Sequence, residues 1–193
     1  MTHRFDPKQM AKLDSPVRRQ ILPPELVISK LPLLPGQVIV DFGCGSGYFT
    51  EPLARQVGLN GKVLAVDVAP EMLAATRERC DQAGLLNVEY VQTDGVNLLL
   101  PQPADGVFLA NVLHEIEKPV EFLQQLAAVM TTAGWLAIVE WLPQPMEWGP
   151  PLSERLTIQA IYELVEGSGW ELLCWEKLPP AHGLAIARRK YDD

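Results

Sequence analysis

The chain has 193 residues, of which 48% are hydrophobic and 21% are charged, as in an ordinary globular protein of one domain. This composition excludes intrinsic disorder for the bulk of the chain. The formal charge of -8 repels a polyanion, so no nucleic acid is expected as the main partner.

The first 20 residues are polar and charged and lack the apolar stretch of a secretory signal. No apolar run approaches the roughly 18 residues needed to span a bilayer, so no membrane partner is expected. Cys44, Cys80 and Cys174 are widely spaced, with neither a CxxC pair nor metal-ligand spacing. We therefore expect a cytoplasmic protein without a metal site.

Residues 1–30 contain no strand signal and are interrupted by Pro23-Pro24, which predicts a helical or irregular N-terminal cap. Residues 31–193 are expected to form a single domain. Short apolar runs there predict buried strands at 38–42, 62–68, 87–93, 106–112 and 135–141. Helical spacing of apolar residues predicts helices at 48–57, 71–80 and 120–130. This alternation predicts a doubly wound, Rossmann-like α/β fold with a mainly parallel sheet and helices on both faces.

The pattern changes after residue 141. Residues 142–151 hold four prolines and a glycine, which predicts a loop that shapes or covers a site. A helix is expected over 152–168. Strands at 171–178 and 183–189, joined by a short link, predict an antiparallel hairpin at one end of the sheet.

The most informative stretch, Asp41-Phe42-Gly43-Cys44-Gly45-Ser46-Gly47, lies between a predicted strand and a predicted helix. Alternate glycines permit positive φ and let a nucleotide-like ligand approach the backbone N–H groups. The dinucleotide pattern GxGxxG would need a third glycine where Tyr48 or Thr50 stands, which disfavours an NAD-binding oxidoreductase. Asp41 beside the loop suits a ligand that carries an ammonium and a sulfonium.

Acids or an amide end the next three strands. Asp67 can accept hydrogen bonds from both ribose hydroxyls, a role that serves NAD and S-adenosylmethionine alike. Asp94-Gly95 ends the third strand and Asn111 the fourth. Open α/β sheets bind ligands at the carboxyl ends of their strands, so these residues are expected at one site.

The motifs DFGCGSG, VDVAPEML, QTDG and ANVLHE, in this order and spacing, resemble the class I S-adenosylmethionine-dependent methyltransferases. The resemblance runs from about residue 13 to residue 189 and is to small methyltransferase-type-11 proteins. Their cofactor half is similar to that of ubiquinone/menaquinone C-methyltransferases and arsenite methyltransferases. The cysteine set of the arsenite enzymes is not evident. The resemblance implies a seven-stranded sheet whose last strand is antiparallel.

The resemblance also implies which residues hold the methionine part of the cofactor. Asp41, Gly43 and Gly45 would bind it, with Gly47 packing the helix close to the sheet. Asn111 would lie beside the methionine moiety near the sulfonium. The alternative for the glycines is a tight turn that merely needs positive φ.

For the nucleoside, the resemblance implies that Asp67 takes the ribose hydroxyls and that Val68 and Met72 sandwich the adenine. Asp94 would read the adenine amine, with Gly95 nearby. The alternatives are a solvated strand end for Asp67 and a plain turn for the Asp-Gly pair.

His114 and Glu115 follow the fourth strand, near where a transferred methyl should lie, and are the candidates for a general base. Either could instead cap the next helix. His182 is expected to face the pocket or to be exposed in a hairpin loop. Further candidates for the pocket wall are Trp141, Trp148, Tyr162, Glu140 and Arg155.

The sequence thus predicts a methyltransferase that moves the sulfonium methyl to a small-molecule acceptor by in-line displacement. The alternative is a non-catalytic cofactor-binding or interaction protein with a methyltransferase-like fold. The acceptor atom and the oligomeric state have no signature in the sequence.

Overall fold

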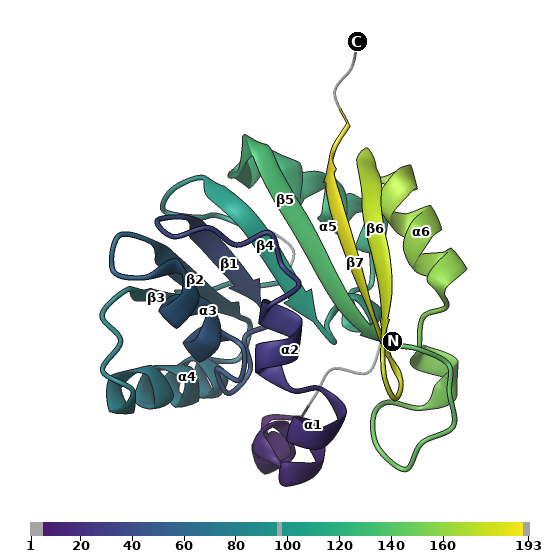
Figure 1. Cartoon of the computed structure of the whole chain (residues 1–193), viewed down its shortest axis with the longest axis horizontal. Coiled ribbons are helices and arrows are strands. Elements are labelled where there is room, and N and C mark those ends of the chain that lie inside the picture. Colours follow the sequence, from purple (N-terminus) through teal and green to yellow (C-terminus); the bar gives the residue numbers. More distant parts are fainter. Residues whose placement is uncertain (1–5, 96–97, 191–193) are drawn as a thin grey trace.

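The computed structural model describes residues 6–95 and 98–190, which form one seven-stranded sheet in the order β3-β2-β1-β4-β5-β7-β6 (Figure 1). The strands are β1 (Val38–Phe42), β2 (Lys62–Asp67), β3 (Val88–Gln92), β4 (Ala104–Ala110), β5 (Met130–Trp141), β6 (Trp170–Leu178) and β7 (His182–Arg189). β7 runs antiparallel to both β5 and β6, while β1 to β5 pair in parallel. The predicted fold class, with its antiparallel last strand, is confirmed.

Helices cover both faces of this sheet. They are α1 (Pro16–Ile21), α2 (Pro24–Ile28), α3 (Thr50–Val57), α4 (Pro70–Gln82), α5 (Pro119–Leu126) and α6 (Ile158–Gly167), with short 3-10 helices η1 (Pro7–Asp14), η2 (Leu113–Glu115), η3 (Ala127–Val129) and η4 (Leu152–Glu154). None of the helices in the described part of the chain is long and apolar enough to span a bilayer.

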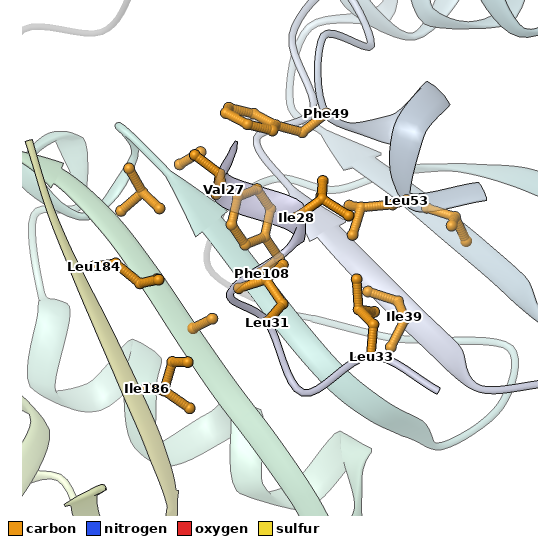
Figure 2. Packing of buried hydrophobic residues seen from close by; sticks show 14 of the residues in the cluster. Val27, Ile28, Leu31, Leu33, Ile39, Phe49, Leu53, Phe108, Leu184 and Ile186 are labelled. Atoms are coloured by element: carbon orange, nitrogen blue, oxygen red, sulfur yellow. The ribbon is translucent and has the colours of Figure 1, made fainter. Parts of the chain in front are cut away.

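Neighbouring side chains of β1 point to opposite faces, and each face has its own core. Ile39 packs in a cluster with residues of α2 and α3, part of which Figure 2 shows around Phe108. Val40 packs in the other cluster, with residues of α5 and α6. Because both faces of the central strands are buried, β1, β2, β4 and most of β5 are apolar runs without alternation, as the sequence predicts, whereas the edge strands β3 and β6 are partly exposed.

The N-terminal residues contribute to the first of these clusters. α1 ends at Ile21 and α2 begins at Pro24, so the predicted break at Pro23-Pro24 is confirmed. Leu22 and Val27 are buried in the same cluster as Ile39. The boundary between a cap over residues 1–30 and a domain over 31–193 stays a prediction.

Several element boundaries differ from the prediction. The helix expected over 120–130 ends at Leu126, and Met130 already opens β5, where the β-branched residues that follow favour extended backbone. The helix expected over 152–168 starts at Ile158, because the Thr157 side chain accepts from the N–H of Ala160 and caps it there. β4 covers 104–110 instead of 106–112, since Asn111 leaves the extended conformation with φ +60°.

Candidate active site

A cavity of about 1200 Å³ opens at the carboxyl ends of β1, β2, β4 and β5. Figure 1 shows α1 and the loop 142–151 at this same edge of the sheet, where the arrowheads of β1 and β4 point. The predicted site residues on its wall are Asp41, Gly43, Gly45, Asp67, Val68, Met72, Gly95, Asn111, His114 and Glu115. Gly47 and Asp94 are not on the wall, and Asp94 is exposed at the strand end.

The glycine loop has the backbone that the sequence predicts. Gly43, Gly45 and Gly47 have φ of +71°, +55° and +78°. The N–H of Gly43 donates to the carbonyl of Val66 over 2.7 Å, which ties the loop to β2. A Cβ at Gly43 would lie 2.4 Å from Cγ2 of Val112. Glycine is therefore required here by the turn itself, and the turn also exposes the loop to the cavity.

Gly47 makes a different close approach from the one that the resemblance implies. A Cβ built on it would lie 3.1 Å from Cγ2 and 3.2 Å from Cα of Thr76, which belongs to α4 and not to the sheet. The Thr76 hydroxyl also donates to the carbonyl of Gly45 over 2.8 Å. Gly47 thus lets the loop pack against α4.

Asp41 is almost fully buried at the cavity wall, with 2% of its surface exposed. Its Oδ2 accepts a hydrogen bond from Thr50 Oγ1 over 2.5 Å. Burial raises the pKa of Asp41 to about 7, and the charge of Asp67 adds to this, while Thr50 acts against it. A carboxylate held this way gains from a cation placed in the cavity.

Arg18 is a functional candidate that the sequence reasoning missed. It comes from α1, its guanidinium lies 4.4 Å from the ring centroid of Tyr48, and Nη1 donates to the carbonyl of Leu13. Burial lowers its pKa, and the charge of Asp41 is among those that oppose the shift. Both side chains line the same cavity. The sequence of the short α1 contains no motif that would associate Arg18 with the glycine loop. Only the fold shows that Arg18 and Asp41 line one cavity.

Asp67 connects the loop to the end of β2. Its Oδ2 accepts from the N–H of Gly45 and its Oδ1 from the N–H of Ala69, each over 3.0 Å. Burial raises the pKa of Asp67, and these backbone hydrogen bonds act against that shift. Each carboxylate oxygen has a second lone pair, so Asp67 can still accept from a ligand.

Asn111 has a strained backbone and an unsatisfied side chain. Its φ of +60° is rare outside glycine, and its N–H donates to the carbonyl of Val139 over 2.8 Å. Its buried Oδ1 has no hydrogen-bond partner among the described residues. Strain and an orphaned polar atom in a cavity wall are features of a ligand-binding position.

His114 is held by the buried carboxylate of Glu140. The distance from His114 Nδ1 to Glu140 Oε2 is 2.8 Å, and the Glu140 side chain is fully buried. Burial opposes the charged imidazole, but the hydrogen bond to Glu140 and the charges of Glu140, Glu115 and Glu154 outweigh it and raise the pKa of His114. Glu115 lies farther away, with Oε1 3.9 Å from His114 Nε2.

His182 is neither on the cavity wall nor exposed, so both expectations for it are wrong. It opens β7, is fully buried, and its ring centroid lies 3.9 Å from that of Trp141. Neither ring nitrogen has a hydrogen-bond partner in the described part of the chain. Burial, helped by the charges of Arg18 and Arg155, lowers its pKa to about 3. It is a neutral core residue.

The remaining pocket candidates divide by position. Trp141 and Trp148 line the cavity, whereas Tyr162 lies exposed on α6, whose buried positions are Ile161 and Val165. Tyr162 therefore does not belong to the aromatic wall.

Arg155 organises the loop that carries Trp148. Nε donates to the carbonyl of Pro150 and Nη2 to that of Trp148, each over 2.9 Å, and Nη1 donates to the carbonyl of Gln144. The guanidinium also lies 5.2 Å from the ring centroid of Trp141. One buried side chain thus fixes the loop 142–151 beside the cavity.

Comparisons with known proteins agree with this geometry. A family model described as a methyltransferase domain matches residues 39–134. Over 121 residues the chain is 31% identical to the ubiquinone/menaquinone biosynthesis C-methyltransferase UbiE of Salmonella arizonae, covering 62% of this chain and 47% of that protein. The chain thus spans about half the length of the curated relatives it matches.

Two solved structures extend the comparison over most of the chain. A SAM-dependent methyltransferase from Aquifex aeolicus is 30% identical, with a TM-score of 0.89, over 95% of this chain and 98% of that chain. The [4+2]-cyclase SpnF is 17% identical, with a TM-score of 0.74, over 86% of this chain and 79% of that chain. SpnF shares the fold alone.

Proposed function

Because this chain belongs to the S-adenosylmethionine-dependent methyltransferases, we propose that it transfers the methyl group of that cofactor to a small-molecule acceptor by in-line displacement. The observation that carries the proposal is a single cavity with Asp41 and Arg18 on one part of its wall and an oriented His114 on another. Its volume of about 1200 Å³ must accommodate the cofactor and the acceptor together. Ligand pockets commonly measure roughly 300 to 1000 Å³, so the room left suits a small molecule.

When bound, S-adenosylmethionine supplies an electrophilic methyl on a positively charged sulfur. Asp41 would accept from its ammonium, and Arg18 would pair with its carboxylate. The buried Asp41 carboxylate, whose pKa is raised, is the feature of this chain that fits a cationic group. Asn111 would turn its orphaned Oδ1 toward the methionine moiety, beside Gly43 and Gly45.

For the nucleoside part, Asp67 would accept from the ribose hydroxyls, and Val68 and Met72 would enclose the adenine. Gly95, which lies on the wall, would face the adenine amine, and Asp94, which lies off the wall, would have to turn toward it. Gly47 would act indirectly, through its packing on α4.

At the reacting end, His114 and Glu115 are the proposed candidates for a general base. Proximity and alignment alone can supply roughly 7 to 11 kcal/mol of barrier lowering in well-oriented systems, so much of the rate would come from how the wall positions the acceptor. All three cysteines are free thiols, which fits the reducing cytoplasm that we propose as the location.

The first test is the thermal shift on adding S-adenosylhomocysteine, with NADH as the control ligand. At 100 times the dissociation constant, binding adds about 2.7 kcal/mol, a rise in Tm of roughly 5 to 11 °C for a chain of this size. The rise should be absent with NADH and largely lost in Asp67→Ala. No shift with S-adenosylhomocysteine would refute the proposed cofactor site. A shift without transfer of labelled methyl to any member of a metabolite panel would favour a non-catalytic binding protein.

A further inference from the structure

Glu140 is a fully buried carboxylate that faces His114 from the end of β5. Oε2 lies 2.8 Å from Nδ1 of His114 and accepts from the N–H of Trp141 over 3.1 Å, and Oε1 accepts from the N–H of His114 over 3.3 Å. Within the described residues, His114 is its ion-pair partner, and no lysine or arginine pairs with it. Burying a carboxylate costs free energy unless hydrogen bonds compensate it. The three hydrogen bonds compensate the buried Glu140 carboxylate and fix its position relative to His114.

This arrangement fixes the protonation of the imidazole. A carboxylate can only accept, so Nδ1 of His114 carries the proton and Nε2 keeps its lone pair in the neutral ring. The groups that face the ring are Glu140 from β5, Glu115 from η2 and Glu154 from η4. The His114 side chain is 6% exposed and lies on the cavity wall. Nε2 is therefore the basic atom available to a molecule in the cavity.

The chemistry of the wall bears on the acceptor. The wall carries six aromatic side chains and five glutamates: Phe42, Tyr48, Phe49, Phe122, Trp141 and Trp148, and Glu115, Glu117, Glu121, Glu147 and Glu154. The basic side chains on the wall are Lys12, Arg18 and Lys118, of which Lys118 is 3.5 Å from Glu121. Apolar rings suit an aromatic acceptor. The excess of carboxylates repels an acceptor that is already an anion in solution.

A hydroxyl acceptor in such a cavity must therefore arrive neutral and lose its proton there. An aromatic hydroxyl, with a pKa near 10 as in tyrosine, is within reach of an imidazole base, whereas an aliphatic one is far less acidic. A neutral amine already has a free lone pair and needs no base before attack. The His114–Glu140 pair would therefore assist methylation of an aromatic hydroxyl, whereas methylation of an amine would not require it.

We propose that Glu140 is the positioning residue that makes His114 the general base, and that the acceptor is a neutral aromatic hydroxyl compound. The inference rests on the proposed methyl transfer. The acceptor oxygen forms its bond to the methyl carbon while the carbon–sulfur bond breaks and sulfur keeps the electron pair. The hydroxyl proton moves to Nε2 of His114, and the imidazolium is stabilised by Glu140. In this mechanism Glu115 is part of the cavity wall and takes no part in the proton transfer.

The experiment compares wild type with Glu140→Gln, using catechol, 1,2-diaminobenzene and phthalate as matched acceptor probes and labelled S-adenosylmethionine as the donor. Catechol should be the methylated probe. Since a general base contributes about 100- to 10,000-fold, kcat for catechol should fall by about 100-fold or more in Glu140→Gln, with little change in the Kd of S-adenosylhomocysteine. His114→Gln, which leaves Glu140 in place, should show a similar loss. Glu163→Gln on α6 is the control for an exposed glutamate and should behave as wild type.

Two pH measurements separate positioning from a structural role. The kcat/KM of wild type should rise with pH as His114 loses its proton, and this limb should move to lower pH in Glu140→Gln, because the carboxylate no longer favours the imidazolium. Nitrogen NMR of the S-adenosylhomocysteine complex should show Nδ1 protonated and the same downward move of the His114 titration. If the rise of kcat/KM occurred at the same pH in Glu140→Gln as in wild type, or if Nδ1 of His114 carried no proton, the positioning role of Glu140 would be overturned.

The outcomes also separate this inference from the proposed function. Preferred methylation of the diamine or of phthalate would overturn the acceptor class while leaving methyl transfer intact. Binding of S-adenosylhomocysteine without turnover of catechol would likewise overturn the acceptor class. Failure to bind S-adenosylhomocysteine at all would instead refute the proposed cofactor site.

Discussion

The backbone N–H of Gly45 donates a hydrogen bond to Oδ2 of Asp67 over 3.0 Å, which joins the glycine loop to the end of β2. The two residues are 22 positions apart in the chain and belong to separate motifs. Because Oδ1 also accepts from the N–H of Ala69, Asp67 connects the glycine loop with the residue that precedes α4. The acid that we propose to bind the ribose hydroxyls is therefore also a structural part of the loop.

Replacement of this acid should weaken cofactor binding. Asp67→Asn keeps one side-chain oxygen but loses the charge, and hydrogen bonds to charged groups contribute about 1.5 to 3 kcal/mol. The Kd of S-adenosylhomocysteine should rise about 10- to 100-fold in calorimetric titration. Asp81→Asn, an exposed position on α4, is the matched control and should keep the wild-type Kd. Equal affinities in the two variants would contradict the assigned role.

Gly43 should be sensitive to substitution for two separate reasons. Gly43→Ala places a Cβ 2.4 Å from Val112 Cγ2 and also requires φ of +71°. Gly36→Ala requires a similar φ of +89° but meets no atom within 4 Å, so it measures only the free-energy cost of a positive φ. That cost is about 1 to 2 kcal/mol. In urea unfolding Gly43→Ala should lose more than Gly36→Ala, and adding Val112→Ala should recover part of the difference. Equal losses would show that Val112 yields without cost.

The fold and the edge of the sheet that carries the cavity were predictable from the sequence because each depends on local pattern. Buried strands are continuous apolar runs, and strand ends are marked by Asp41, Asp67 and Asn111. The loop glycines are required by positive φ, which a sequence can signal directly.

Other features depend on contacts between distant segments and had no such signal. Arg18 reaches the cavity only because α1 packs beside the glycine loop. Glu140 was predicted as a candidate for the wall, but it lies behind His114 and not on the wall, and this contact requires the ends of β5 and η2 to meet. His182 looked like a loop residue because Pro179-Pro180 precedes it, yet its pairing in β7 opposite Trp141 buries it.

The stability of the protein should depend on the ionisation of Asp41. The pKa of this carboxyl, about 7, lies well above its value of 3.8 in an unfolded chain. The protonated form is favoured by folding, so this contribution to stability is present below pH 3.8 and lost as pH rises through about 7. The apo form of Asp41→Asn should therefore gain stability over wild type at pH 8, on the order of 2 to 4 kcal/mol, and little at pH 4.

Binding of S-adenosylhomocysteine should show the opposite trend, because its ammonium needs the ionised carboxylate. Below pH 7 Asp41 is largely protonated, so binding should release up to one proton there, and well above pH 7 close to none. Calorimetry in buffers of different ionisation enthalpy measures this number. Proton release that does not change between pH 6 and pH 8 would argue against Asp41 as the ammonium partner.

His182 should make the protein sensitive to acid. Its pKa of about 3 lies below the 6.5 of an unfolded chain, so its contribution to stability is present above pH 6.5 and lost as pH falls toward 3. His182→Phe keeps a ring against Trp141 and removes the two unsatisfied nitrogens. It should gain on the order of 2 kcal/mol over wild type at pH 5, beyond any difference at pH 8, in urea unfolding. The same difference at both pH values would count against a buried neutral imidazole.

Arg155 should control the order of the loop beside the cavity without affecting cofactor binding. Arg155→Lys replaces a planar fork that donates to the carbonyls of Gln144, Trp148 and Pro150 by a single ammonium, which cannot satisfy all of them in this geometry. Loss of one such bond, about 1.5 to 3 kcal/mol, should speed chymotrypsin cleavage after Trp148 by about 10- to 100-fold. The Kd of S-adenosylhomocysteine should stay at the wild-type value, since Asp41 and Asp67 are untouched. Arg77→Lys, which alters a guanidinium 4.1 Å from the Tyr90 ring, is the matched control and should leave cleavage at Trp148 unchanged. Cleavage as slow as in wild type would show that the loop is held by its prolines and not by Arg155.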